Sequence, residues 1–82
     1  MPDVIADVRS FMATQLRIVG AESVGPETPL VKRGVLDSIE LMQIVEFLEA
    51  TYSIRIDDIE ILPENLGSLA LMAALVERKL SR

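Results

Sequence analysis

Aliphatic side chains recur at steps of three and four residues along three separate stretches of this 82-residue chain. That spacing gathers them on one face of an α-helix and argues against the alternation of a half-buried strand. Aromatic residues make up only 4% of the sequence. The core must therefore be aliphatic, which favours helix packing over a β-sandwich. We predict one all-α domain over residues 1–82, because so short a chain cannot close two cores.

The first helix is expected over residues 3–17, with Asp3 as its N-cap. Its apolar stripe consists of Val4, Ile5, Val8, Phe11, Met12, Leu16 and Val19. Gly20 stops the pattern, and glycine and proline then interrupt any periodicity, so residues 20–36 should form a long surface loop. Three apolar side chains are expected to pin this loop to the core: Leu30, Val35 and Leu36.

The start of the second helix is marked most clearly. The Asp37 side chain can accept from the amide of Glu40 while the Glu40 side chain reaches back to the amide of Asp37, which is a capping box. The helix should cover residues 38–52. Its inward stripe is predicted to be Leu41, Met42, Val45 and Leu48, with Ile44 and Phe47 at the margins.

The last third of the chain should contain an extended connector, a short helix over residues 57–61 that Pro63 ends, and a final helix over residues 66–80. Arg78 and Lys79 suit the negative end of that helix. Its inward side chains are expected to be Leu69, Met72, Leu75, Val76 and Leu80. The prediction is a small four-helix bundle of three main helices and one short helix, with a first loop longer than such bundles usually have.

The chain contains no cysteine and no histidine. Disulfides, thiolate nucleophiles, cysteine-based zinc sites and the commonest general base are thereby excluded, and we predict that the protein is not an enzyme. The formal net charge of -5 is the wrong sign for nucleic acid or an anionic membrane. Without a leader or a long apolar run, the expectation is a cytoplasmic monomer.

Ser38 is the side chain that could carry chemistry. It lies in the first turn of the predicted second helix, directly after a constrained loop, and should be exposed. A helix start offers unpaired amides and a partial positive charge, which suit a phosphate ester on this serine. The plain alternative is a surface serine without a role, since Asp and Ser are common at helix starts.

The segment from Gly34 to Leu41 (GVLDSIEL), the acidic helix after it, the DDIE turn at 57–60 and the PEN stretch at 63–65 together resemble the acyl carrier protein family. The resemblance covers residues 4–80. It implies that Ser38, preceded by the motif residue Asp37, receives 4′-phosphopantetheine from coenzyme A and carries acyl groups as thioesters. A chain without cysteine needs such a borrowed thiol.

Acidic side chains are concentrated next to Ser38. Residues 37–60 hold seven acids and one base, a net -6 out of a total of -5. A solvated helix face is the ordinary explanation, but by resemblance we expect a surface for basic patches on partner enzymes. Its members are Glu40, Glu46, Glu49, Asp58 and Glu60. No metal site is expected, because the acids at 57–60 lack the pattern of a calcium loop.

The family implies a phosphopantetheinyl transferase, an acyl- or aminoacyl-activating ligase or an acyltransferase, and a downstream synthase or transferase as partners. Gln43, Ala50 and Thr51 stand where carriers of primary fatty acid synthesis usually show acids, and Ile39 replaces a leucine. This favours a specialised fatty-acid or polyketide-type pathway. An aminoacyl or peptidyl carrier and an unmodified acidic adaptor are the alternatives. Met1 suggests a free-standing protein, but a domain excised from a synthase stays open.

Overall fold

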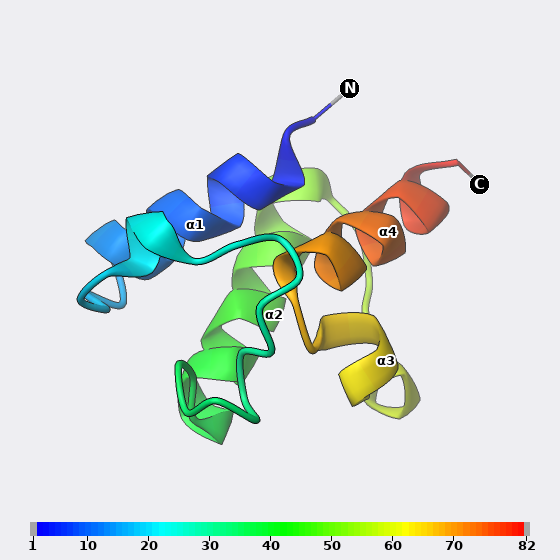
Figure 1. The fold of residues 1–82 in the computed structure, drawn as a ribbon. Coiled ribbons are helices and arrows are strands. Elements are labelled where there is room, and N and C mark those ends of the chain that lie inside the picture. Colours follow the sequence, from blue (N-terminus) through cyan, green and yellow to red (C-terminus); the bar gives the residue numbers. More distant parts are fainter. Residues whose placement is uncertain (1, 82) are drawn as a thin grey trace.

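The computed structural model describes residues 2–81, which form four α-helices and two short 3₁₀ helices without any strand (Figure 1). The elements are α1 (Val4–Thr14), η1 (Ala21–Ser23), α2 (Ser38–Tyr52), η2 (Asp58–Glu60), α3 (Pro63–Leu66) and α4 (Leu69–Leu80). The predicted all-α class, with three longer helices and a short one, is confirmed.

The core is aliphatic, as the composition predicts. Its largest fully buried side chains come from every α-helix and from the first loop: Val4, Val8, Met12, Leu30, Ile44, Leu48, Leu66, Leu69, Met72, Leu75 and Val76. Two of the few aromatic rings, Phe11 of α1 and Phe47 of α2, stack with centroids 4.4 Å apart. Aromatic contact therefore joins two helices at the margin of an otherwise aliphatic core.

The first helix is shorter than predicted. The Asp3 side chain caps α1 by accepting from the amide of Ala6, but the helix ends at Thr14 and not at residue 17. Arg17 takes a left-handed φ of 55°, and the chain reverses around it. Val19, which we expected on the inward stripe, is 99% exposed because it lies beyond this reversal.

The second helix has the predicted bounds and the predicted capping box. Its inward stripe is rotated from the predicted one, because Ile44 is completely buried with Val45 and Leu48, whereas Met42 is 42% exposed. Residues 44, 45 and 48 keep the three- and four-residue spacing of one helix face. Met42 was wrongly placed on that face.

The short helical turn forms where it was predicted, as the 3₁₀ helix η2 at residues 58–60. A further short helix, α3, was not predicted: it begins at Pro63, which we expected to end a helix. Proline suits the first helical position because its missing N–H would have no partner there. The final helix then starts at Leu69 after the cap residue Ser68, so the predicted helix over 66–80 combined the end of α3 with α4.

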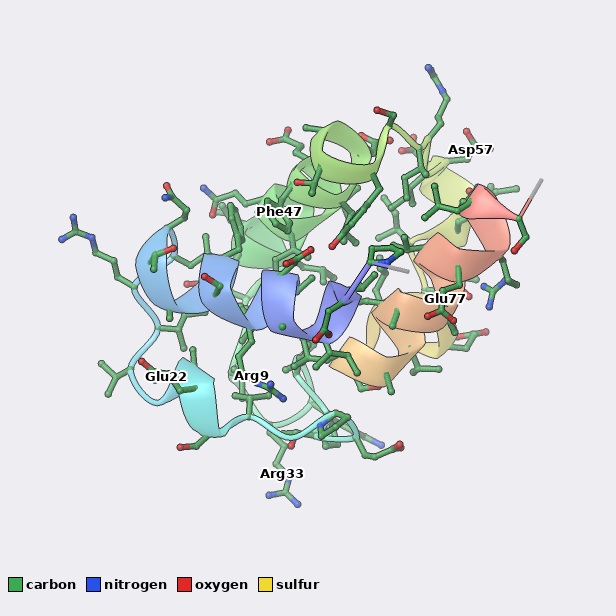
Figure 2. All side chains as sticks on the ribbon, turned by 90° about the horizontal axis from the view of Figure 1, so that it is seen from above. Arg9, Glu22, Arg33, Phe47, Asp57 and Glu77 are labelled. Carbon is green, nitrogen blue, oxygen red and sulfur yellow. The ribbon has the colours of Figure 1, made fainter. Side chains whose placement is uncertain are left out.

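Hydrogen bonds and ion pairs fix the segments around the helices. Arg9 of α1 donates from Nε and Nη2 to the carbonyl of Val24, at 3.0 and 2.8 Å, and so fastens the first loop to α1. Figure 2 shows Arg9 on the side of α1 that faces this loop. Lys79 in the last turn of α4 forms a 2.6 Å ion pair with Glu60 of η2. Leu80, predicted to face inward, is instead 45% exposed.

A partly buried hydrogen bond joins α1 to α2. The hydroxyl of Tyr52 at the end of α2 donates to the Asp7 carboxylate of α1 at 2.5 Å. Partial burial of the hydroxyl is the main cause that raises the pKa of Tyr52 above its ordinary value, and the hydrogen bond to Asp7 is the second cause. Among residues 2–81, none of the helices combines the length and the apolar content needed to cross a membrane.

Candidate functional site

Ser38 is exposed and is the first helical residue of α2. The residues on either side of Ser38 and Ile39 bond to each other: the Glu40 amide donates to Asp37 Oδ1 at 2.7 Å, and the Asp37 amide donates to Glu40 Oε1 at 3.0 Å. These bonds satisfy two of the helix-start amides. The amides of Ser38 and Ile39, and the Ser38 hydroxyl, have no hydrogen-bond partner within residues 2–81.

The chain leading to Ser38 is held tightly. The carbonyl of Leu30 accepts from the amides of Val35 and Leu36, at 2.8 and 3.1 Å, which closes a turn ending just before Asp37. Gly34 has a φ of +76° within this turn, a conformation that glycine adopts without strain. Leu30 and Leu36 are both buried, as predicted, so the serine projects from a backbone fixed to the core.

These features fit the phosphate of a phosphopantetheine ester. A phosphate on the Ser38 hydroxyl would lie at the positive end of a 15-residue helix, beside two amides that have no acceptor in the described part of the chain. Exposure of the side chain leaves room for the rest of the arm. In the bound state the arm supplies the thiol that this cysteine-free chain lacks.

The five predicted docking acids have different surroundings. Three make contacts within the protein: Glu40 in the capping box, Glu49 as acceptor for the Ile56 amide at 2.8 Å, and Glu60 through Lys79. Glu46 and Asp58 are exposed, and no side-chain bond within residues 2–81 engages either of them. Glu46 and Asp58 are therefore the acids whose charge is most available to a partner.

The sequence analysis missed the structural roles of two residues, Gly67 and Arg9. A Cβ atom on Gly67 would lie 2.5 Å from the Pro63 carbonyl oxygen, so only glycine fits at the corner between α3 and α4. The proline four residues earlier is the signal that could have indicated this corner. The bond from Arg9 to Val24 could not be predicted from the sequence, because its acceptor is a backbone carbonyl.

No cluster of three or more metal-ligating side chains occurs among residues 2–81.

Comparison with known proteins agrees with this geometry. Residues 6–76 match the family described as phosphopantetheine attachment site. A probable acyl carrier protein, PigG, of Serratia sp. (strain ATCC 39006) is 31% identical over 84% of this chain and 79% of its own length.

Two solved structures share the fold. A holo acyl carrier protein from Nitrosomonas europaea has a TM-score of 0.80 at 24% identity, and the match covers 99% of this chain and all of that one. A chain in a crystal structure of an FAD-dependent dehydrogenase has a TM-score of 0.73 at 29% identity, over 84% of this chain and 97% of that one.

The family match covers more than half of the chain, and the Serratia relative supports it independently of the fold. Members of this family carry covalent 4′-phosphopantetheine and are carriers, not enzymes, which confirms the cofactor and the absence of catalysis that the sequence predicted. The chain belongs to the phosphopantetheine attachment-site family, as an acyl carrier protein.

Proposed function

We propose that Ser38 is the residue that carries phosphopantetheine, and that the protein tethers acyl intermediates there as thioesters. The observation that supports this most directly is the Ser38 hydroxyl on the first turn of α2, which, like the two amides beside it, has no hydrogen-bond partner among residues 2–81. Asp37, as helix cap and motif residue, fixes the start of α2 and so the position of the serine.

The intact mass of the protein tests this assignment, measured before and after incubation with coenzyme A and a broad-specificity phosphopantetheinyl transferase. We expect the wild type to gain one phosphopantetheine and Ser38→Ala to gain none. Ser10→Ala, which removes an exposed serine of α1, is the matched control and should gain it fully. A folded wild type that gains no mass, or modification of Ser38→Ala, would contradict the assignment.

The acidic side of α2 and η2 is the proposed docking surface for enzymes with basic patches. Glu46 and Asp58 should contribute most, since Glu40, Glu49 and Glu60 already make contacts within the protein. Exposed charges of this kind act mainly on encounter rate and specificity, and salt weakens them. Docking should therefore weaken as ionic strength rises.

Charge reversal separates docking from folding. We expect Glu46→Lys and Asp58→Lys each to raise the KM of the transferase for the carrier several-fold, without lowering the unfolding temperature. Glu77→Lys reverses an exposed acid on α4 and should leave KM unchanged. Equal effects from all three variants would mean that net charge, and not this surface, governs docking.

The pathway and the loading partner are proposed at a coarser level. A specialised fatty-acid or polyketide-type pathway agrees with the reduced charge of α2, and an aminoacyl or peptidyl carrier is the alternative with the same arm. Loading would come from an activating ligase or an acyltransferase. The likeness to a chain in an FAD-dependent dehydrogenase structure adds a flavin-dependent dehydrogenase to the downstream enzymes worth testing. Incubation with each candidate ligase and its acid, followed by mass, distinguishes the two kinds of cargo.

A further inference from the structure

Two neighbouring cations, Lys32 and Arg33, lie at the tip of a turn in the first loop. The Gly34 amide donates to the Val31 carbonyl at 3.0 Å, so the two cations occupy the centre of this turn. Both side chains are exposed, and neither forms a hydrogen bond or an ion pair within residues 2–81. Figure 2 shows Arg33 pointing away from the helices. The charge of this cation pair is therefore available to a binding partner.

An unengaged pair of cations is unusual in this acidic chain, whose net charge is -5. Of the other cations among residues 2–81, only Arg17 lacks a side-chain contact. The engaged cations are Arg9, Arg55, Arg78 and Lys79, which contact Val24, Asp57, Asn65 and Glu60. The fold does not depend on the charges of Lys32 and Arg33, so changing them should cost little stability.

An apolar groove of about 740 Å³ lies beside the same turn, between the first loop and the corner where α3 meets α4. Its lining includes Pro29, Val31, Lys32, Pro63, Ala70 and Leu71. Val31 is 48% and Leu71 39% exposed. Lys32 belongs both to the cation pair and to the groove. One partner segment can therefore contact positive charge and an apolar wall together.

Backbone hydrogen bonds fasten the two walls of the groove to each other. The amide of Leu30 donates to the Gly67 carbonyl at 2.9 Å, and the amide of Ala70 donates to the Pro26 carbonyl at 2.9 Å. In Figure 1 the first loop crosses beside the start of α4, where these bonds lie. The groove and the turn are therefore formed before any partner arrives, and docking there has little ordering entropy to overcome.

The cation pair and the acids of α2 flank Ser38 in the chain. Arg33 precedes Ser38 by five residues, which span at most about 18 Å even when fully extended. Glu46 follows Ser38 by eight helical residues, a rise of about 12 Å along α2. An enzyme whose entrance covers Ser38 therefore has positive charge of the carrier within reach on one side and negative charge on the other.

We propose that the cation pair and the groove beside it dock an acidic amphipathic segment of a partner enzyme. The apolar side chains of that segment would cover Val31 and Leu71, and its carboxylates would meet Lys32 and Arg33. Glu27 also borders the groove and repels a carboxylate at its own position, which restricts where the acids of the segment can lie.

This site differs in sign from the proposed docking surface on α2 and η2. A wholly basic partner surface suits Glu46 but is repelled by the cation pair. The carrier therefore favours enzymes whose charge is divided in the same way, and the division fixes their orientation over Ser38. This selection, though not the binding of the acidic segment itself, rests on the proposed function at Ser38.

NMR titration of the full-length protein with two short helical peptides tests the proposal. Both peptides carry leucines on one face, and the flanking positions are glutamate in one peptide and lysine in the other. We expect the glutamate peptide to shift the Gly34 amide signal and the Val31 and Leu71 methyl signals. The lysine peptide should instead shift signals of α2 around Glu46. Added salt should weaken both interactions.

Single charge reversals identify the groups that bind the glutamate peptide. Lys32→Glu and Arg33→Glu should each raise its Kd about threefold, without lowering the unfolding temperature. Arg17→Glu makes the same change of charge at another exposed cation without a side-chain contact among residues 2–81, and it should leave the Kd unchanged. Leu71→Asn should also weaken binding, because it removes part of the apolar wall.

Four outcomes would overturn the proposal. They are shifts outside the turn and the groove, equal weakening by Arg17→Glu, equal binding of both peptides in the groove, and binding to phosphatidylglycerol vesicles in preference to the glutamate peptide. The last would identify a membrane contact. None of these measurements requires phosphopantetheine, so their failure leaves the assignment of Ser38 intact. A protein that gains no mass at Ser38 would refute that assignment and leave the peptide site standing.

Discussion

The two long connections of the molecule are held in different ways. The first loop, residues 20–36, is held by buried aliphatic side chains and by backbone hydrogen bonds. Among residues 2–81, Arg9 is the only helix residue whose side chain forms a hydrogen bond with this loop. The second connection, residues 53–68, also buries Ile56 and Leu66 in the core, but several polar side chains hold it in addition: Glu49 to Ile56, Glu60 to Lys79, and Asn65 to Arg78.

The two connections therefore have different roles: the first loop positions Ser38, and the second carries acids of the proposed docking surface. Apolar burial and backbone bonds depend little on salt or on neighbouring charge, so the loop that positions Ser38 should hold its geometry when a charged partner binds. The second connection carries Asp58 and Glu60 of the proposed docking surface, and the ion pair of Glu60 with Lys79 is one of its own contacts. A basic partner that competes for Glu60 should therefore weaken its ion pair with Lys79, while the backbone bond from Leu30 to Gly67 continues to join the two connections.

Leu30→Ala should have the largest effect on stability. The side chain is completely buried beneath the first loop, and removing it leaves a cavity that costs about 2–5 kcal/mol. Urea unfolding measures the loss, and phosphopantetheine transfer should slow as well because the turn before Ser38 loses its anchor. Val31→Ala, at the exposed neighbour, should cost less than about 1 kcal/mol. Equal costs would mean that burial does not fasten this loop.

Gly67→Ala tests the corner where the two connections meet. The added Cβ would press on the Pro63 carbonyl, so α3 must shift, at a cost of about 1–3 kcal/mol. Gly34→Ala in the first loop meets no atom within 4 Å and should cost only the left-handed backbone strain, about 1 kcal/mol. Asn tolerates that conformation, so Gly34→Asn should recover stability, whereas Gly67→Asn should not. Recovery at both sites would contradict the steric explanation.

Lys79→Met should destabilise the second connection by about 1 kcal/mol through loss of the half-buried ion pair with Glu60. The difference from wild type should shrink as salt is added, and hydrogen exchange should rise in η2 and α3 while the first loop stays protected. Arg55→Met breaks a 4.0 Å pair between exposed side chains and is the matched control with little expected effect. Faster hydrogen exchange in the first loop of this variant would contradict the proposal that the two connections are held independently.

Sequence reasoning located the parts of this fold that depend on local rules. The cap at Asp3, the capping box at Asp37 and the start of α2 follow from side chains bonding to nearby amides, and all were predicted. Which side chains of a helix face the core was harder to predict. Met42 and Ile44 differ by two positions on one helix, and only the packing of α1 and α4 decides which of them is buried.

The candidate site was predictable to a similar depth. Exposure of Ser38 at a helix start follows from the local pattern. The groove was not predictable, because its walls meet through bonds between backbone groups of Leu30 and Gly67, which no residue type reveals. The failure to expect α3 has a simpler cause: Pro63 was taken as a helix end, although proline is also favoured at the first helical position.

The smallest effect is expected at Tyr52, whose bond to Asp7 ties α1 to α2 outside both connections. Because the pKa of Tyr52 is raised in the folded protein, the bond contributes fully below the unfolded value of about 10, and its contribution falls as pH rises above that value. Urea midpoints at about pH 8 and about pH 11 should show this loss, and Tyr52→Phe should lack that part of it. A pH dependence identical with and without the hydroxyl would mean that the α1–α2 contact, like the first loop, depends on packing alone.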